Sequence, residues 1–180
     1  MKIYVMRHST TVWNEKGITQ GRTNNRLSKK GKSLTEEVSL KFKDVAFDVI
    51  FASPLMRTIQ TANIMNKHHN TKIIKDARLI EIDQGIFSGK CWHKLSPEEK
   101  TLKALQSKEC GMESYESVYE RVKNFINELV TQNNYKNILI VTHNVNASLI
   151  ADILNNIEVD FKNASHLRNF NNAEIKCFEV

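Results

Sequence analysis

The amino-acid sequence predicts an α/β domain in three layers, with a mostly parallel central sheet and helices on both of its faces. Three apolar runs, IYVM at 3–6, VIFA at 49–52 and ILIV at 138–141, have the length and character of buried strands. Helix-like stretches separate these runs, as in parallel strands joined by helical crossovers. No internal repeat or linker divides the chain, so we expect one domain over residues 1–180.

The first half of the chain alternates between strand and helix signals. A polar loop with two glycines follows the opening strand over residues 12–26, and Ser28 is expected to be the N-cap of a first helix. A second strand is expected over 48–53. Proline suits the first turn of a helix, so we expect the next helix to span Pro54–Lys67. A short third strand is expected over residues 72–75.

The second half begins with a loop over residues 76–89. Residues 90–110 carry no clear apolar stripe and are expected to form a surface excursion or short lid, with a Pro-Glu-Glu start for a short helix. The best helical periodicity lies over 114–131. A further helix is expected to follow the 138–141 strand, and the alternating tail at 173–180 predicts a last strand at an edge.

Composition excludes several classes of protein. Hydrophobic residues make up 41% and charged residues 26% of the chain, as in ordinary globular domains. No apolar run approaches the roughly 18 residues of a membrane span, and no signal-peptide pattern opens the sequence. Three cysteines without CxxC spacing argue against a disulfide framework or a zinc site, so we expect a cytoplasmic protein. The net charge of +6 is spread along the chain, which favours a solvated surface over a nucleic-acid or membrane partner.

Basic and imidazole side chains follow the three long predicted strands. The first strand runs into Arg7 and His8, the second leads to Arg57 in the next helix, and the 138–141 strand leads to His143. The ends of parallel strands lie at one edge of a sheet, where ligands usually bind. Arg7 and His8 alone fit an exposed basic turn equally well, but the repetition at three strand ends favours one pocket.

Two arginines and two histidines in one pocket suit a phosphoryl group. The planar guanidinium matches phosphate oxygens, and helix N-termini add N–H donors. Nearby cations disfavour protonation of a histidine, whose free ring nitrogen is then a nucleophile. Glu81 and Asp83, in the loop after the third strand, are both candidates for the acid that protonates the leaving oxygen, with a pKa raised by the phosphate charge.

Other catalytic patterns are absent from the sequence. It contains no P-loop, no GxGxxG and no GxSxG motif. His68 and His69 have no acidic or cysteine partners at ligand spacing, so we expect surface histidines and no metal site.

Short blocks with recognisable spacing extend from residue 1 to about residue 175. They are Arg7-His8-Ser9, Thr11–Asn14, Gln20-Gly21, Leu27–Gly31, Ser53–Ala62, Leu79–Gly85, Gly111–Ser114 with Arg121, and Thr142–Asn144. In this combination the chain resembles the histidine phosphatase superfamily, which includes cofactor-dependent phosphoglycerate mutases and acid phosphatases. The block Ser-Pro-Leu-Met-Arg-Thr-Ile-Gln-Thr-Ala is its most specific match.

The resemblance implies a role for each matching residue. His8 would be the nucleophile that becomes phosphohistidine, and Glu81 would protonate the leaving oxygen and then assist the attacking water. The phosphoryl oxygens would be held by Arg7, Arg57 and His143. The pocket wall would include Asn14, Gln20, Gly21 and Asn144. The resemblance implies no metal and no cofactor, and a small phosphorylated molecule as substrate.

Three positions depart from the family pattern. Ser9 and Asn144 replace motif glycines, and Phe87-Ser88-Gly89 stands where many members have Trp-Glu-Gly. A phosphomonoester hydrolase is the leading hypothesis, because the excursion at 90–110 is shorter than the insert of typical mutases. A cofactor-dependent phosphoglycerate mutase and a weakly active or non-catalytic module that binds phosphate or a phosphoprotein remain alternatives. The sequence identifies neither the leaving group nor the oligomeric state.

Overall fold

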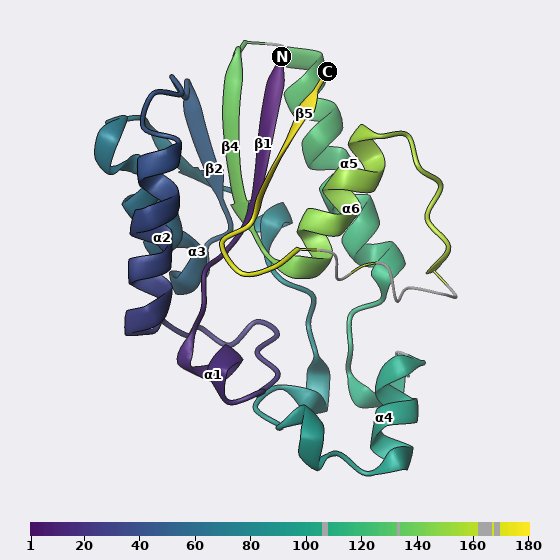
Figure 1. Cartoon of the computed structure of the whole chain (residues 1–180). Coiled ribbons are helices and arrows are strands. Elements are labelled where there is room, and N and C mark those ends of the chain that lie inside the picture. Colours follow the sequence, from purple (N-terminus) through teal and green to yellow (C-terminus); the bar gives the residue numbers. More distant parts are fainter. Residues whose placement is uncertain (106–107, 133, 162–166, 168–169) are drawn as a thin grey trace.

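The computed structural model describes residues 1–105, 108–132, 134–161, 167 and 170–180. These residues form a five-stranded sheet in the order β3-β2-β4-β1-β5 (Figure 1). The strands are β1 (Lys2–Arg7), β2 (Val49–Ala52), β3 (Ile73–Lys75), β4 (Asn137–Thr142) and β5 (Ile175–Glu179). Strands β1, β4, β2 and β3 pair in parallel, and β5 runs antiparallel to β1 at the edge. The mostly parallel sheet and the C-terminal edge strand are therefore confirmed.

Helices cover both faces of the sheet, as predicted. Figure 1 shows α2 and α3 on one side of the strands and α5 and α6 on the other. The α-helices are α1 (Val12–Glu15), α2 (Lys29–Lys41), α3 (Met56–Met65), α4 (Pro97–Ala104), α5 (Tyr115–Gln132) and α6 (Asn144–Leu154). Short 3₁₀ helices occupy Asn66–His68, Ala77–Leu79, Gly85–Phe87, Trp92–Lys94 and Lys108–Cys110.

The apolar core is split between the two faces of the sheet. Along β1, Ile3 and Val5 pack into the cluster that α5 and α6 complete, whereas Met6 packs into the cluster on the α2–α3 side. Because successive side chains of a strand point to opposite faces, burial on both faces requires an uninterrupted apolar run. This double burial is the physical reason that the opening strand is continuously apolar in the sequence.

The helix expected over Pro54–Lys67 and the loop expected over 12–26 differ from the structure. Helix α3 ends at Met65, where a 3₁₀ helix follows over Asn66–His68. The helix expected at Pro54 begins at Met56, because Leu55 has the extended backbone of an N-cap and its carbonyl accepts the first helical hydrogen bonds. Arg57 is therefore the second residue of α3. The loop expected over 12–26 contains α1, whose first turn is closed by a reciprocal capping box between Thr11 and Asn14.

The start of the segment at 90–110 lies next to the polar loop at 12–26; residues 106 and 107 of this segment lie outside the described residues. The backbone N–H of Thr19 donates to the carbonyl of Lys90 (2.9 Å), and that of Trp92 donates to Gly17 (3.1 Å). Figure 1 shows α1 and α4 at the end of the molecule toward which the parallel strands run. The short helix expected after Ser96 is present as α4. None of the helices within the described ranges has the length and apolar character needed to span a membrane.

Candidate active site

The ends of β1, β4 and β2 bring the predicted histidines together. Arg7 pairs in register with Thr142, so His8 and His143, which follow them, become neighbours across two adjacent parallel strands. Their ring centroids are 5.3 Å apart. The Oγ atom of Ser53, just beyond the end of β2, lies 2.7 Å from Nε2 of His143. Three strand ends thus meet at one point, as the sequence pattern predicts.

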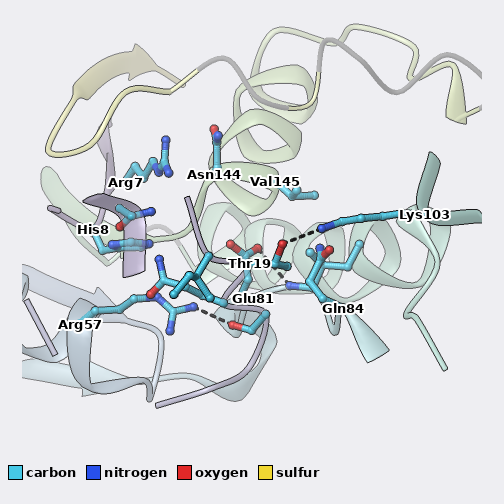
Figure 2. A pocket seen from close by; sticks show the side chains of 14 residues that line it. Arg7, His8, Thr19, Arg57, Glu81, Gln84, Lys103, Asn144 and Val145 are labelled. Atoms are coloured by element: carbon cyan, nitrogen blue, oxygen red, sulfur yellow. Dashed lines mark hydrogen bonds between the residues drawn. The ribbon is translucent and has the colours of Figure 1, made fainter. Parts of the chain in front are cut away.

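A cavity of about 190 Å³ opens at this edge of the sheet (Figure 2). Eight of the nine predicted site residues line it: Arg7, His8, Asn14, Gln20, Gly21, Arg57, Glu81 and Asn144. His143 is not part of the lining and is fully buried beside it. The lining also includes side chains that the sequence did not single out, namely Ile18, Thr19, Ile82, Gln84, Lys103 and Val145.

The imidazole of His8 is held in one tautomer. Its Nδ1 atom lies 2.7 Å from the carbonyl oxygen of Ser9. A carbonyl can only accept a hydrogen bond, so Nδ1 carries the proton and Nε2 keeps its lone pair. Burial lowers the pKa of His8 well below the usual histidine value, and the charges of Arg57 and Arg7 lower it further. His8 is therefore a neutral imidazole with a nucleophilic nitrogen at neutral pH.

The two arginines are positioned by backbone carbonyls. Arg57 is fully buried and donates from Nη2 to Gly21 and from Nη1 to Thr23, each at 2.8 Å. Burial lowers the pKa of Arg57 to about 10, so the guanidinium still carries its charge at neutral pH. Arg7 donates from Nη1 to the carbonyl of Phe170 at 2.6 Å. These bonds orient the guanidinium groups before any ligand arrives.

Glu81 is the carboxyl group of the cavity. Burial raises its pKa above the usual glutamate value, although the charge of Arg57 opposes the shift. The raised pKa was expected from the charge of a bound phosphate, but burial alone is enough to produce it. Asp83, the other acidic candidate, does not line the cavity, and its Oδ1 atom accepts a hydrogen bond from Gly85 at 2.9 Å.

His143 lies close to Glu81, just after the end of β4. Its Nδ1 atom lies 3.9 Å from Oε2 of Glu81 and has no hydrogen-bond partner among the described residues. Burial, and after it the charge of Arg57, holds the pKa of His143 well below its usual value. The Oγ atom of Ser53 accepts from the backbone N–H of Leu55 at 3.4 Å, and Nε2 of His143 is the remaining partner of this hydroxyl among the described residues. The hydroxyl therefore donates to Nε2, and Nδ1 carries the proton of the neutral ring.

The two substituted glycine positions have different surroundings. Ser9 is fully buried, and its hydroxyl donates to the carbonyl of Gly31 (2.8 Å), away from the residues that line the cavity. The Oδ1 atom of Asn144 accepts a hydrogen bond from the backbone N–H of Phe170 at 3.1 Å. Ser9 thus joins the strand end to α2 and does not line the cavity, whereas Asn144 lines the cavity and joins α6 to the C-terminal segment.

In the part of the chain that the structure describes, no group of three His, Cys, Asp or Glu side chains is placed to hold a metal ion. His68 and His69 lie at the end of α3, where the ring of His69 packs against Phe47.

Comparisons with known proteins agree on one family. The profile of the histidine phosphatase superfamily (branch 1) matches residues 3–180. The chain is 33% identical over 151 residues to phosphoserine phosphatase 1 of Hydrogenobacter thermophilus, covering 81% of this chain and 72% of that protein. It is 26% identical over 175 residues to a probable phosphoglycerate mutase of Erwinia tasmaniensis, covering 94% of this chain and 81% of that protein.

Solved structures share the fold. YhfR of Bacillus stearothermophilus superposes with a TM-score of 0.87 at 23% identity, covering 99% of this chain and 91% of that one. A putative alpha-ribazole-5'-P phosphatase from Escherichia coli superposes with a TM-score of 0.86 at 22% identity, covering 100% of this chain and 91% of that one. At identities below 25%, this similarity establishes only the fold. The chemistry is therefore argued from the residues that line the cavity.

Proposed function

The chain belongs to branch 1 of the histidine phosphatase superfamily, and from that premise we propose that it hydrolyses a small phosphorylated metabolite through a phosphohistidine at Nε2 of His8. The observation that carries this proposal is the single tautomer of a buried, neutral His8 beside two oriented arginines. The cavity, at about 190 Å³, is smaller than the roughly 300–1,000 Å³ of drug-sized ligand sites, which favours a small substrate.

The proposed reaction has two steps. In the first, the lone pair on Nε2 of His8 attacks phosphorus, the bond from phosphorus to the ester oxygen breaks, and that oxygen takes the carboxyl proton of Glu81. In the second, water attacks phosphorus, Glu81 takes a proton from it, and the electron pair of the P–N bond returns to His8. Phosphate then leaves. Charge spreads over the three equatorial oxygens in each step, so catalysis depends mainly on positioned cations and donors.

Three side chains would hold those oxygens. Arg7 and Arg57 line the cavity with fixed guanidinium groups. The third would be His143, which would donate to a phosphoryl oxygen from Nδ1. This atom has no hydrogen-bond partner among the described residues. Residues 90–110, which border the cavity through Lys103, are proposed to act as a short lid over the leaving group.

A phosphoglycerate mutase is the second candidate, because some relatives carry that name as a probable activity. A mutase must shield its phosphoenzyme from water, and the short segment at 90–110 favours hydrolysis. Addition of 3-phosphoglycerate with its bisphosphate primer distinguishes the two, since only a mutase forms 2-phosphoglycerate. A non-catalytic module is disfavoured, because it has no need of both a neutral His8 and a Glu81 carboxyl group with a raised pKa.

Trapping the phosphoenzyme tests the proposal. The wild-type protein, mixed with p-nitrophenyl phosphate and quenched in alkali, is expected to carry one added phosphoryl group on the peptide that contains His8. The uncatalysed reaction is among the slowest known, so His8→Ala should abolish both this adduct and turnover. His68→Ala, a change at the end of α3 far from the strand ends, is the matched control. Full turnover by His8→Ala contradicts the mechanism.

A further inference from the structure

Thr61 links the helix that carries Arg57 to the strand end that carries His8. It lies on α3, one turn after Arg57, and is fully buried without lining the cavity. Its Oγ1 atom donates to the carbonyl of Arg57 at 2.8 Å and accepts from the backbone N–H of Ser9 at 3.2 Å. An amide N–H can only donate and a carbonyl can only accept, so the direction of both hydrogen bonds is fixed.

The sheet does not supply this link. Strand β1, which ends at Arg7, pairs with β4 and β5, and β4 separates it from β2, the strand that leads into α3. The spacing between His8 and Arg57 therefore depends on contacts outside the pairing of the strands. The hydrogen bond from Ser9 to Thr61 is such a contact, made directly between the end of β1 and α3.

The backbone of the nucleophile is held from several sides. The N–H of His8 donates to the carbonyl of Thr142 at 2.9 Å, and its carbonyl accepts from Nδ2 of Asn172 at 3.1 Å. The N–H of the same peptide group belongs to Ser9 and donates to Thr61. The carbonyl of Ser9 accepts in turn from Nδ1 of His8. A change in the Ser9 backbone would move that carbonyl, so Thr61 helps to fix both the place and the tautomer of the His8 ring.

A second threonine has the same local geometry without this link. A threonine inside a helix often donates to the carbonyl one turn earlier, which is a purely local contact. Thr35 does so on α2, where its Oγ1 atom donates to Gly31 at 2.7 Å, and it is also fully buried. Gly31 accepts from the hydroxyl of Ser9 as well, so both threonines act near the same strand end. The bond from the Ser9 N–H is what distinguishes Thr61.

We propose that Thr61 is a positioning residue for the phosphorylation of His8, and that it fixes the nucleophile relative to Arg57 through the backbone of Ser9. This inference rests on the proposed phosphatase function. Nucleophilic attack depends steeply on geometry, and a misplacement of about 1 Å can cost roughly 100-fold in rate. Thr61 touches no reacting atom, so it acts on the substrate only through His8 and Arg57.

Thr61→Val keeps the shape of the side chain and removes both hydrogen bonds. In single-turnover kinetics with p-nitrophenyl phosphate, we expect formation of the phosphoenzyme to slow by roughly 10- to 100-fold. KM should change little, because the Arg57 guanidinium keeps its carbonyl partners, Gly21 and Thr23. An alkyl phosphate should show the same loss, since attack by His8 is impaired and proton donation by the cavity carboxyl group is not.

Control variants separate positioning from stability. Each rate is divided by the folded fraction from urea unfolding. Thr61→Ser retains the hydroxyl and should keep most of the rate, and Thr35→Val should keep the full rate although it loses a buried hydrogen bond. If Thr61→Val does not fold, Thr61→Ala and Thr35→Ala give the same comparison with a smaller side chain. A full rate in Thr61→Val, an equal loss in Thr61→Ser, or an equal loss in Thr35→Val overturns the proposal.

NMR of the histidine ring nitrogens reports on the nucleophile without turnover. The wild-type protein should show His8 as a single tautomer protonated at Nδ1, Thr61→Val a mixture of both tautomers, and Thr61→Ser the single form. Hydrolysis by the wild type with a full rate in Thr61→Val leaves the phosphatase function standing and overturns the role of Thr61. Absence of hydrolysis of any phosphomonoester overturns the phosphatase function; the tautomer mixture in Thr61→Val then still supports positioning, and an unchanged tautomer overturns it.

Discussion

The Nε2 atom of His143 lies 2.7 Å from the Oγ atom of Ser53, and both side chains are fully buried. The contact joins the ends of two adjacent strands, β4 and β2. It also decides which imidazole nitrogen faces Glu81, because a hydroxyl that donates to Nε2 leaves the proton on Nδ1. Ser53 is therefore a positioning residue, which orients His143 and acts on the phosphoryl group only through it.

Ser53→Ala is expected to lower kcat by about tenfold or more and to destabilise the fold by roughly 1–3 kcal/mol, because Nε2 is left buried without a partner. Steady-state kinetics and urea unfolding measure the two effects. Ser39→Ala is the matched control: this buried serine donates to the carbonyl of Ile64 far from the cavity, so it should lose stability but keep kcat. An unchanged kcat in Ser53→Ala contradicts the positioning role.

Ser9→Gly restores the residue of the family pattern beside the nucleophile. We expect kcat to stay within about twofold, because the Ser9 hydroxyl is directed to Gly31 and not to the cavity. Stability should fall by about 1–2 kcal/mol through the lost hydrogen bond and the added backbone freedom of glycine. Chemical denaturation and assay with p-nitrophenyl phosphate decide the matter. A rise in kcat of more than tenfold would mean that Ser9 crowds the phosphoryl group after all.

Much of the site could be predicted from the sequence, because several of its residues lie at the ends of predicted strands. Arg7, His8 and His143 follow apolar runs directly, and parallel strands place such residues at one edge whatever the details of packing. The contact that orients the buried His143 could not be predicted, because it is made with Ser53 at the end of a different strand.

Other features depend on tertiary contacts or on very short local signals. Lys103 reaches the cavity only because the segment at 90–110 pairs with the loop at 12–26, and no periodicity in the sequence reports that pairing. Helix α1 is a single turn, closed by the capping box between Thr11 and Asn14. It is too short to show an apolar repeat in the sequence. The predicted start of α3 was two residues too early, because Pro54 is equally compatible with the bend at Pro54 and Leu55 that precedes the helix.

Glu113→Gln tests how the acid loop is held. The Glu113 carboxylate accepts two hydrogen bonds from Arg121, at 3.0 and 3.1 Å, and a third from Arg22, which also donates to the carbonyl of Glu81. Burial works to raise the pKa of Glu113, but the hydrogen bonds and charge of Arg121 outweigh it, so the pKa lies below its usual value. We expect Glu113→Gln to cost about 1–3 kcal/mol near neutral pH and to lower kcat.

The pH dependence of that loss has a definite sign. Because folding depresses the pKa of Glu113, its contribution is complete above the usual glutamate pKa and disappears as pH falls through the folded value. The difference in unfolding free energy between wild type and Glu113→Gln should therefore shrink in acid. Glu120→Gln, at an exposed position of α5, serves as control. A difference that is constant from neutral pH to acid pH contradicts the ion-pair explanation.

Glu81→Gln separates proton donation from phosphate binding. Protonation matters when the leaving group is an alkoxide and much less when it is p-nitrophenolate, which leaves without a proton. We therefore expect kcat to fall by roughly 10²- to 10⁴-fold with an alkyl phosphate and by far less for formation of the phosphoenzyme from p-nitrophenyl phosphate. The raised pKa of Glu81 keeps the acid form present above the usual glutamate range, so wild-type activity should decline as pH rises through that pKa. Loss of this decline in Glu81→Gln, measured by single-turnover kinetics with both esters, would identify Glu81 as the acid, and equal losses with the two leaving groups would exclude it.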